Sequence, residues 1–271
     1  MYYSAASHCS VDVLEKWNCG EPCEKNPSVQ DVSPLINDAA GTFGFVGYNA
    51  NLGEILVSFR GSVNIANWVT NINFLKEAYP GVQGAEVHSG FYEAYKGVRD
   101  QVIGSVRALQ YRHPSAKFTV TGHSLGGALA TFAAMDIKEQ ISGDRHMDLY
   151  TFGSPRTGNQ QWSDYVNTQL ANGGYQRITH YNDIVPHLPM TQMGFNHAGD
   201  EQWYFNEGGD LQFKTCLNTV GKGENQSCAD TIILTGVAAH LEYLGHMMGG
   251  MCTSYQLGFG PQVAAEQSFL A

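Results

Sequence analysis

Basic residues are scarce in this chain of 271 residues, where 15 lysines and arginines stand against 25 aspartates and glutamates. The formal net charge of −10 makes nucleic acid and anionic membrane faces unfavourable partners. Long apolar runs are also missing, since no stretch approaches the ~20 residues that a membrane-crossing helix needs. These absences predict a soluble protein that neither binds nucleic acid nor carries a transmembrane segment.

Internal repeats, low-complexity tracts and long linkers are absent as well. Hydrophobic residues make up 43% of the chain and charged residues 15%, a balance typical of globular proteins and not of disordered ones. The length is also compatible with two smaller domains, but no break in composition marks a boundary. We therefore expect residues 1–271 to form one domain.

The six cysteines form an even set that is concentrated near the two ends of the chain. Unrelated buried thiols are the plain alternative to disulfides. Metal ligation fits poorly, because no two cysteines form a Cys-x-x-Cys pair and no histidine lies at zinc-finger spacing. Disulfides that tie the ends together predict an oxidising compartment. The cysteines are Cys9, Cys19, Cys23, Cys216, Cys228 and Cys252.

Secretion into the extracellular space is the interpretation that follows. The tripeptide Asn225-Gln226-Ser227 is a candidate N-glycosylation site and agrees weakly, because such triplets often arise by chance. The start of the chain lacks the basic residues and the apolar core of a signal peptide, so we expect a mature or recombinant form.

Apolar periodicity predicts strands that alternate with helices, which indicates an α/β fold with a mostly parallel sheet and crossover helices. Residues 1–35 are expected to form an extended, disulfide-tied arm. The predicted elements are a hairpin of Phe43–Tyr48 and Glu54–Phe59, an amphipathic helix over Phe91–His113, strands at Phe118–Thr121, Asp148–Phe152 and Tyr175–His180, and helices at Leu125–Lys138 and Gln160–Leu170.

A Gly-x-Ser-x-Gly motif centred on Ser124 lies where a predicted strand turns into a predicted helix. By composition alone a chain of this kind yields roughly 0.2 such matches, so the pentapeptide by itself is weak. Its position is specific, because a sharp strand-to-helix turn needs small residues on both sides and exposes the serine hydroxyl in a cleft. An incidental serine in a glycine-rich turn is the alternative. The context favours Ser124 as a nucleophile.

A serine hydroxyl needs a base to remove its proton, and in folds of this kind an acid and then a histidine follow the nucleophile along the chain. Asp183 lies just after a predicted strand, although a lone Asp in a turn more often bonds the backbone. Residue pattern alone cannot choose among the four later histidines. His240 is favoured by its apolar neighbours, and His246 is the reserve. All four are His187, His197, His240 and His246.

Four segments of the chain resemble the fungal-type secreted lipases, also called class 3 lipases. Residues 58–62 read SFRGS, residues 120–130 read VTGHSLGGALA, residues 177–186 read RITHYNDIVP, and residues 239–245 read AHLEYLG. The resemblance runs from about residue 3 to residue 252 and implies an α/β-hydrolase-like fold. It implies Ser124 as nucleophile, Asp183 as acid and His240 as base.

The same resemblance implies an oxyanion hole made by the backbone amides of Ser62 and Leu125, with the Ser62 hydroxyl as a further donor. It implies no metal and no organic cofactor. It also implies the disulfide pairs Cys9–Cys252, Cys19–Cys23 and Cys216–Cys228. Arg60 is expected to be structural and not catalytic.

Residues 63–72 place four apolar side chains on one helical face, with asparagines opposite. A short amphipathic helix packed on the core is the ordinary interpretation. Resemblance to the family's lid favours a mobile flap that covers the cleft in water and opens at a lipid surface. The four side chains are Ile65, Trp68, Val69 and Ile72.

The resulting hypothesis is a secreted, monomeric triacylglycerol lipase that acts at an oil–water interface through an acyl-enzyme. A feruloyl esterase or another carboxylesterase on the same fold is the alternative, and the apolar lid face argues for an oily substrate. A lipid-binding protein without activity is a third possibility, which the complete set of Ser124, Asp183 and His240 disfavours.

Overall fold

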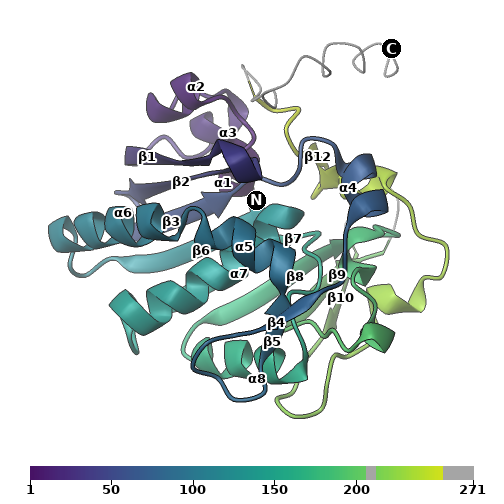
Figure 1. The fold of residues 1–271 in the computed structure, drawn as a ribbon. Coiled ribbons are helices and arrows are strands. Elements are labelled where there is room, and N and C mark those ends of the chain that lie inside the picture. Colours follow the sequence, from purple (N-terminus) through teal and green to yellow (C-terminus); the bar gives the residue numbers. More distant parts are fainter. Residues whose placement is uncertain (206–211, 253–271) are drawn as a thin grey trace.

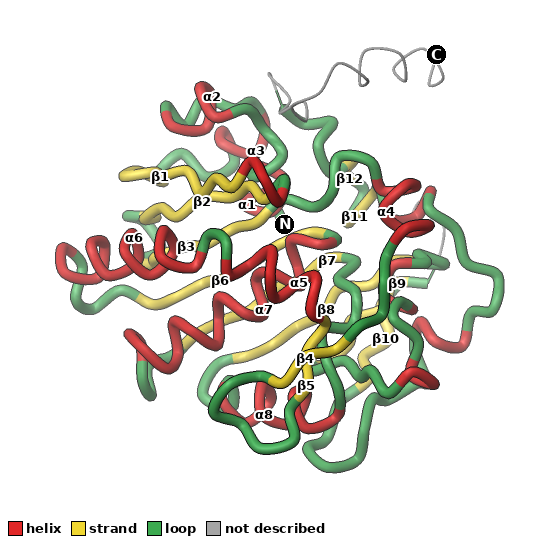
Figure 2. Tube along the Cα trace, viewed as in Figure 1, coloured by secondary structure: helices red, strands yellow, loops and turns green. Residues whose placement is uncertain are grey.

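An eight-stranded sheet crosses the structure, a computed structural model that describes residues 1–205 and 212–252 (Figures 1 and 2). Its spatial order is β1-β2-β3-β6-β7-β8-β9-β10. Strands β3, β6, β7, β8 and β9 run parallel, and antiparallel pairs flank them on both sides. The strands are β1 (Val29–Asn37), β2 (Thr42–Asn49), β3 (Glu54–Phe59), β6 (Lys117–His123), β7 (Met147–Phe152), β8 (Gly174–His180), β9 (Asp200–Tyr204) and β10 (Phe213–Cys216).

Helices cover both faces of this sheet, which explains why β3 is buried throughout and β6 is buried at all positions but its first. Alternate residues of a strand point to opposite faces. Ile55 and Val57 belong to the main core beneath the larger helices, whereas Leu56 belongs to a second core beneath the N-terminal helices. The larger helices are α5 (Ser89–Lys96), α6 (Arg99–Arg112), α7 (Leu125–Ile137) and α8 (Gln160–Gln169).

The arrangement confirms the predicted α/β-hydrolase-like fold, with its mostly parallel sheet and flanking helices. The predicted hairpin and the strands that precede the helices α7 and α8 lie where the periodicity put them, within one or two residues. No helix among the described residues is long and apolar enough to span a bilayer.

The prediction of an extended arm over residues 1–35 is wrong. That segment forms α1 (Tyr2–Ala6), α2 (Val11–Glu15) and α3 (Glu21–Glu24) before β1 begins. Small residues let α1 pack closely on the sheet, and Ser4, Ala5 and Ala6 are fully buried. Each helix is only four or five residues long, too short to produce a recognisable helical period.

The helix predicted over Phe91–His113 is two helices, α5 and α6, separated at Gly97 and Val98. Asn37 Nδ2 donates to the Gly97 carbonyl at 3.2 Å, and a Cβ on Gly97 would lie 2.0 Å from that nitrogen. The apolar positions continue across the break, with Tyr95 and Val98 both buried. The periodicity therefore identified the buried face but not the interruption.

Strands β9 and β10 were not predicted. In β9 the buried position 201 is a glutamate, which hides the alternation of polar and apolar residues. Thr179 donates a hydrogen bond to Glu201 at 2.6 Å, and Arg177 lies 3.6 Å away, so the buried carboxylate has partners. Smaller elements complete the fold: α4 (Ile65–Asn71), β4 (Lys76–Ala78), β5 (Glu86–His88), β11 (Glu242–Tyr243) and β12 (His246–Met247).

Three disulfides tie the described residues together, and they are the three pairs that the family resemblance implies. The bridge between Cys9 and Cys252 joins residues 243 apart in the sequence. The other two bridges close short loops and are Cys19–Cys23 and Cys216–Cys228.

Candidate active site

Ser124 occupies a strained turn between β6 and α7. Its φ of 59° and ψ of −132° are unusual for a residue with a side chain. The turn is tight enough to require glycine on both sides: a Cβ on Gly122 would lie 2.1 Å from the Gly126 carbonyl oxygen, and one on Gly126 would lie 2.2 Å from the Phe59 carbonyl oxygen. The sequence motif thus specifies the turn that the structure contains.

Asp183 and His240 form a buried pair beside this turn. Asp183 follows the end of β8, and His240 ends a short 3₁₀ helix, Ala238–His240. His240 Nδ1 donates to Asp183 Oδ2 at 2.8 Å, which leaves Nε2 as the acceptor of the neutral ring. Within the described residues, neither His240 Nε2 nor the buried Ser124 Oγ has a hydrogen-bond partner. Each is therefore available for a proton transfer.

Backbone contacts hold Ser124 and His240 in one place. Ser124 N donates to the Phe152 carbonyl at 2.9 Å, and the next residue, Gly153, lies so close to the Asp183–His240 pair that a Cβ there would collide with it. The His123 ring stacks on the His240 ring at 4.5 Å, and its Nε2 bonds the His240 carbonyl at 2.8 Å. Burial lowers the pKa of His123 well below its ordinary value, so that this ring stays neutral.

Tyr243 is a member of the group that the sequence analysis missed. Its hydroxyl donates to Asp183 Oδ2, the same oxygen that His240 bonds, while Asp183 Oδ1 accepts from the Val185 amide at 2.8 Å. Burial, and then the charge of Asp183, raise the pKa of Tyr243 well above its ordinary value. The only signal in the sequence is that Tyr243 lies three residues after His240.

Gly153 is the second residue of this group that the sequence analysis missed. It has a φ of +55°, and a Cβ there would lie 2.7 Å from Asp183 Oδ2, 2.7 Å from the Tyr243 hydroxyl and 2.9 Å from His240 Nδ1. The glycine therefore leaves the space in which the three side chains meet. Its position directly after a parallel strand was the available signal.

Ser62 and Leu125 are the expected oxyanion donors, and Leu125 directly follows Ser124 in the chain. Leu125 is the first residue of α7, so its N–H has no intrahelical acceptor and lies at the positive end of the helix dipole. Ser62 follows Gly61, whose missing Cβ would lie 2.7 Å from Ser124 Cβ. The segment that carries Ser62 thus passes close to Ser124, and the oxyanion role of the two amides stays a prediction.

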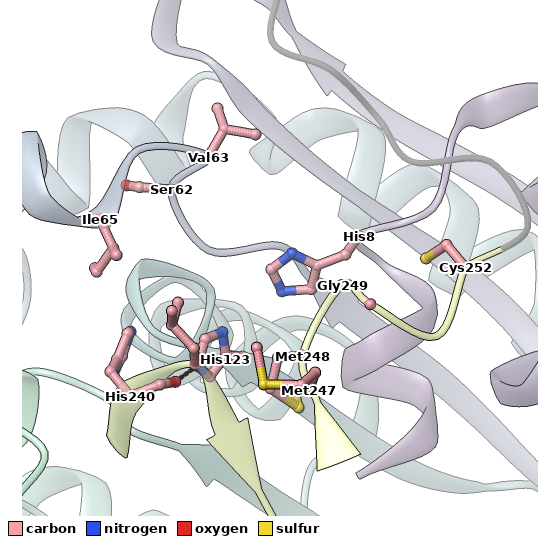
Figure 3. A pocket seen from close by; sticks show the side chains of 12 residues that line it. His8, Ser62, Val63, Ile65, His123, His240, Met247, Met248, Gly249 and Cys252 are labelled. Carbon is pink, nitrogen blue, oxygen red and sulfur yellow. Dashed lines mark hydrogen bonds between the residues drawn. The ribbon is translucent and has the colours of Figure 1, made fainter. Parts of the chain in front are cut away.

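A pocket of about 480 Å³ opens beside this group (Figure 3). Its lining combines the start of α4 with the residues before it, the segment that follows α1, and β12 with the residues after it. Burial, and then the charge of Arg60, lower the pKa of His8 in this lining to about 3, so the ring is neutral at ordinary pH. Apart from His8, Ser62, His123 and His240, the side chains in the lining are mainly apolar: Val63, Ile65, Leu241, Met247, Met248 and Cys252.

Most of the predicted lid forms α4, which begins at Ile65. Asn64 caps this helix, and its side chain accepts from the Asn67 amide at 3.0 Å. Trp68 stacks on Phe91 at 6.0 Å, and Ile65 lines the pocket. The apolar face turns inward as the pattern indicates: Ile65, Trp68, Val69 and Ile72 are half-buried, whereas Ala66, Asn67, Thr70 and Asn71 are exposed.

The remaining histidines that the sequence left open do not contact Asp183. His246 lies against Tyr2, with ring centroids 5.5 Å apart. His187 lies 3.3 Å from Asp230, and His197 bonds the Pro186 carbonyl. Arg60 donates to the Gly41 carbonyl at 3.3 Å and covers the Phe43 ring, which is a structural position.

Comparison with known proteins supplies the family. The family model for class 3 lipases matches residues 56–193. A lipase from Rhizomucor miehei is 34% identical over 257 residues, which cover 92% of this chain and 68% of that protein. Secreted mono- and diacylglycerol lipase 1 from Fusarium solani is 34% identical over 259 residues, 91% of this chain and 74% of that protein.

A solved structure gives the same result in three dimensions. It is described as a triacylglycerol lipase in which a serine protease triad forms the catalytic centre, and it matches with a TM-score of 0.80 and 32% identity. The match covers 92% of this chain and 94% of that one. Sequence and fold agree over most of the chain, which therefore belongs to the class 3 lipase family and is a serine ester hydrolase.

Proposed function

We propose that the chain is a secreted triacylglycerol lipase that hydrolyses ester bonds at an oil–water interface. The observation that carries the proposal is the Asp183–His240 hydrogen bond beside the strained Ser124, at the edge of a largely apolar pocket. Relatives described as lipases of tri-, di- and monoacylglycerols support this substrate class. An apolar lining suits fatty acyl chains better than a phenolic acid, so the feruloyl esterase alternative is not favoured.

The reaction begins when His240 Nε2 takes the proton of Ser124 as Oγ attacks the ester carbonyl carbon. The oxyanion that forms accepts hydrogen bonds from the Ser62 and Leu125 amides, and one such donor is worth about 3–4 kcal/mol of barrier. The tetrahedral intermediate collapses, His240 passes its proton to the departing alcohol oxygen, and an acyl ester remains on Ser124.

Hydrolysis of that ester repeats the sequence with water. His240 takes a proton from the water as its oxygen attacks the acyl carbon, and Ser124 recovers the proton when the fatty acid leaves. Asp183 keeps the ring in the tautomer with Nδ1–H and stabilises its protonated form. These steps use only the chain's own groups, and we propose no metal or organic cofactor.

The setting of the enzyme is part of the same proposal. Three disulfides among the described residues suit an oxidising, extracellular compartment. We propose that α4 and its flanking residues form the lid, that residues 1–271 act as one domain and that the enzyme is a monomer. The apolar side chains of α4 face inward, which supports the lid. At an oil surface these side chains could contact oil instead of the protein.

The test combines substrates with variants. Hydrolysis of tributyrin, measured as its concentration passes the solubility limit, should rise sharply once droplets form, while methyl ferulate should be hydrolysed poorly. Ser124→Ala and His240→Ala should each lower the rate by at least ~10⁴-fold, because the two residues act as a unit. His246→Ala is the matched control and should lower the rate only slightly. A Ser124 variant that keeps a tenth of the activity, or faster hydrolysis of methyl ferulate, would contradict the proposal.

A further inference from the structure

Two triplets of the form Asn-x-Ser or Asn-x-Thr occur in the chain, and they are chemically unequal. Asn26-Pro27-Ser28 has proline in the middle position, which excludes N-glycosylation, whereas Asn225-Gln226-Ser227 satisfies the rule. The first triplet therefore serves as an internal control for the second. Nothing in the proposed ester chemistry uses Asn225, which does not line the pocket beside Ser124.

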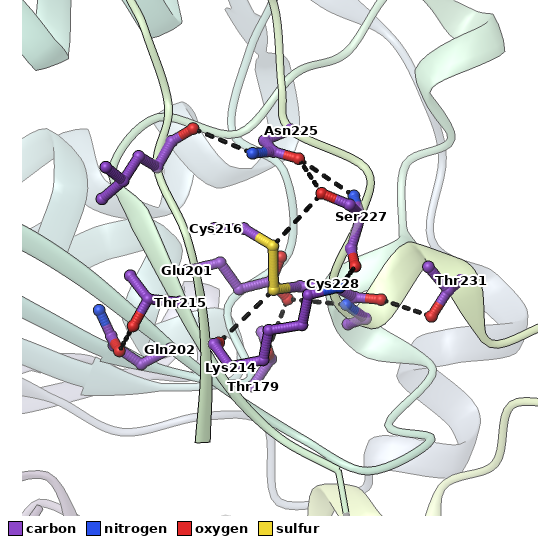
Figure 4. The surroundings of a disulfide bond; sticks show 12 residues. Thr179, Glu201, Gln202, Lys214, Thr215, Cys216, Asn225, Ser227, Cys228 and Thr231 are labelled. Atoms are coloured by element: carbon purple, nitrogen blue, oxygen red, sulfur yellow. Dashed lines mark hydrogen bonds between the residues drawn. A yellow bond between two sulfur atoms is a disulfide. The ribbon is translucent and has the colours of Figure 1, made fainter.

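The second triplet lies in a surface loop that follows β10 and is closed by the Cys216–Cys228 bridge (Figure 4). The hydrogen bonds of the Asn225 carboxamide are solvent-exposed. Its Oδ1 accepts from the Ser227 amide at 3.2 Å and also from the Ser227 hydroxyl. Its Nδ2 donates to the Leu217 carbonyl at 3.2 Å, so that the carboxamide lies beside Leu217.

Two large aliphatic side chains in the same loop are turned toward water. Leu217 is 63% exposed and Val220 is 53% exposed. The loop also adjoins β10, which is an edge strand of the sheet and carries the 48% exposed Phe213. Exposed apolar groups beside a sheet edge promote association between copies unless something covers them. A bulky, hydrated group on Asn225 would cover the surroundings of Leu217 first, because Asn225 Nδ2 bonds the Leu217 carbonyl.

We propose that Asn225 carries an N-linked glycan that shields this loop and the adjoining edge of the sheet. In the transfer, Asn225 Nδ2 bonds to the anomeric carbon of an oligosaccharide, a polyprenyl diphosphate leaves from that carbon, and one Nδ2 proton is lost to solvent. The nitrogen keeps its second hydrogen, which can continue to donate to the Leu217 carbonyl. The modification requires the proposed secretion, because the donor is supplied along the secretory route.

The first experiment determines whether the glycan exists. The full chain is secreted from a yeast host, and its intact mass is measured before and after treatment with a peptide N-glycosidase, which leaves Asp at each deglycosylated position. We expect the wild type and Ser227→Thr to lose an oligosaccharide and to show Asp at position 225 alone, with Asn26 unchanged. Asn225→Gln and Ser227→Ala should carry no glycan and should retain esterase activity.

An unmodified Asn225 in active, secreted wild-type enzyme would overturn the glycan and leave the proposed lipase activity intact. Loss of activity in Ser124→Ala is measured separately, so the two proposals fail independently. If the Asn225→Gln chain is not secreted, Ser227→Ala supplies the same comparison without any change in the asparagine.

The second experiment tests the shield. Light scattering during heating should show that Asn225→Gln aggregates at a lower temperature than the wild type. Adding Leu217→Ser and Val220→Ser to that variant should restore the wild-type aggregation temperature, since the surface that the glycan covered is then polar. Equal aggregation temperatures for wild type and Asn225→Gln would refute the shielding role. If the added serines did not restore the wild-type aggregation temperature, Leu217 and Val220 would not be the surface that the glycan shields, and the proposed shield of this loop would be wrong.

Discussion

The Oδ2 atom of Asp183 accepts hydrogen bonds from both His240 and Tyr243, so two side chains depend on one carboxylate oxygen. Replacing Tyr243 with Phe removes one donor and leaves the ring in place. Losing a hydrogen bond to a charged group costs about 1.5–3 kcal/mol, and we expect kcat on a soluble short-chain ester to fall by roughly 10- to 100-fold.

The matched control for this variant is Tyr95→Phe. Tyr95 is also buried and donates to an aspartate, Asp136, at 2.6 Å, but it lies in the main core away from Ser124. It should lower the melting temperature and leave kcat per folded molecule unchanged. An equal loss of kcat in both variants would mean that Tyr243 contributes only to packing.

Gly153 allows a second test at the scale of single residues. In Gly153→Ala the new methyl group would lie 2.7 Å from Asp183 Oδ2, in a backbone with a φ of +55°. Gly143 has the same φ and nothing within 4 Å of its absent Cβ. Both variants carry backbone strain, but we expect only Gly153→Ala to displace the acid–base pair and to lose about 10²-fold or more in kcat. Similar kcat values in the two variants would contradict this.

The candidate site could be predicted from sequence only in part, for identifiable reasons. The position of Ser124 follows from a local turn whose glycines have a direct steric purpose. His240 could not be chosen from four histidines by pattern, because its selection depends on a contact with Asp183 across 57 residues. Tyr243 and Gly153 act through such contacts as well, and neither has a local motif.

Among the elements, α4 has the clearest functional expectation. The exposure of a tryptophan and three aliphatic side chains costs several kcal/mol at ~25 cal/mol per Å², so the inward-facing position should dominate in water. An oil surface removes that cost and shifts the population toward an open lid. Trp68→Ser should therefore lower the ratio of the rate on emulsified long-chain esters to the rate on soluble short-chain esters.

The control for this variant is Asn67→Ser on the exposed face of the same helix, which should leave the ratio unchanged. Both variants need to be shown folded by circular dichroism. An unaltered ratio in folded Trp68→Ser would mean that the stacking of Trp68 on Phe91 is ordinary core packing.

At this scale, the sequence was most informative where one element is long and regular. The strand β3 and the helix α7 follow from stretches that are mainly apolar. The break at Gly97 and the buried Glu201 of β9 escaped prediction, because the first is set by the distant Asn37 and the second by a hydrogen bond from Thr179. Both are contacts between elements, and they override the local pattern.

For the molecule as a whole, buried histidines predict how stability depends on pH. Burial is the main cause that lowers the pKa of His8 to about 3 and holds the pKa values of His123 and His197 well below their ordinary range. Below pH ~6.5 the unfolded chain binds protons at these residues that the folded chain does not. The free energy of unfolding should therefore fall as the pH drops below 6.5, and for His8 until about pH 3.

The measurement is the thermal midpoint from pH 8 to pH 4, with proton uptake on unfolding determined in two buffers of different ionisation enthalpy. We expect a nearly constant midpoint above pH 7, a steady decline below pH 6.5 and net proton uptake on unfolding. A midpoint that rises between pH 6.5 and pH 5 would show that other groups outweigh the buried histidines.

The bridge between residues 9 and 252 also has a consequence for the timing of biosynthesis. A ribosome adds roughly 5–20 residues per second, so Cys252 is made roughly 10–50 s after Cys9. In the later part of that interval the growing chain already contains Ser124, but it lacks both the partner of Cys9 and the last part of the pocket lining, which extends to Cys252. The nascent enzyme therefore cannot close its substrate pocket until synthesis has passed residue 252, and ester hydrolysis is delayed until then.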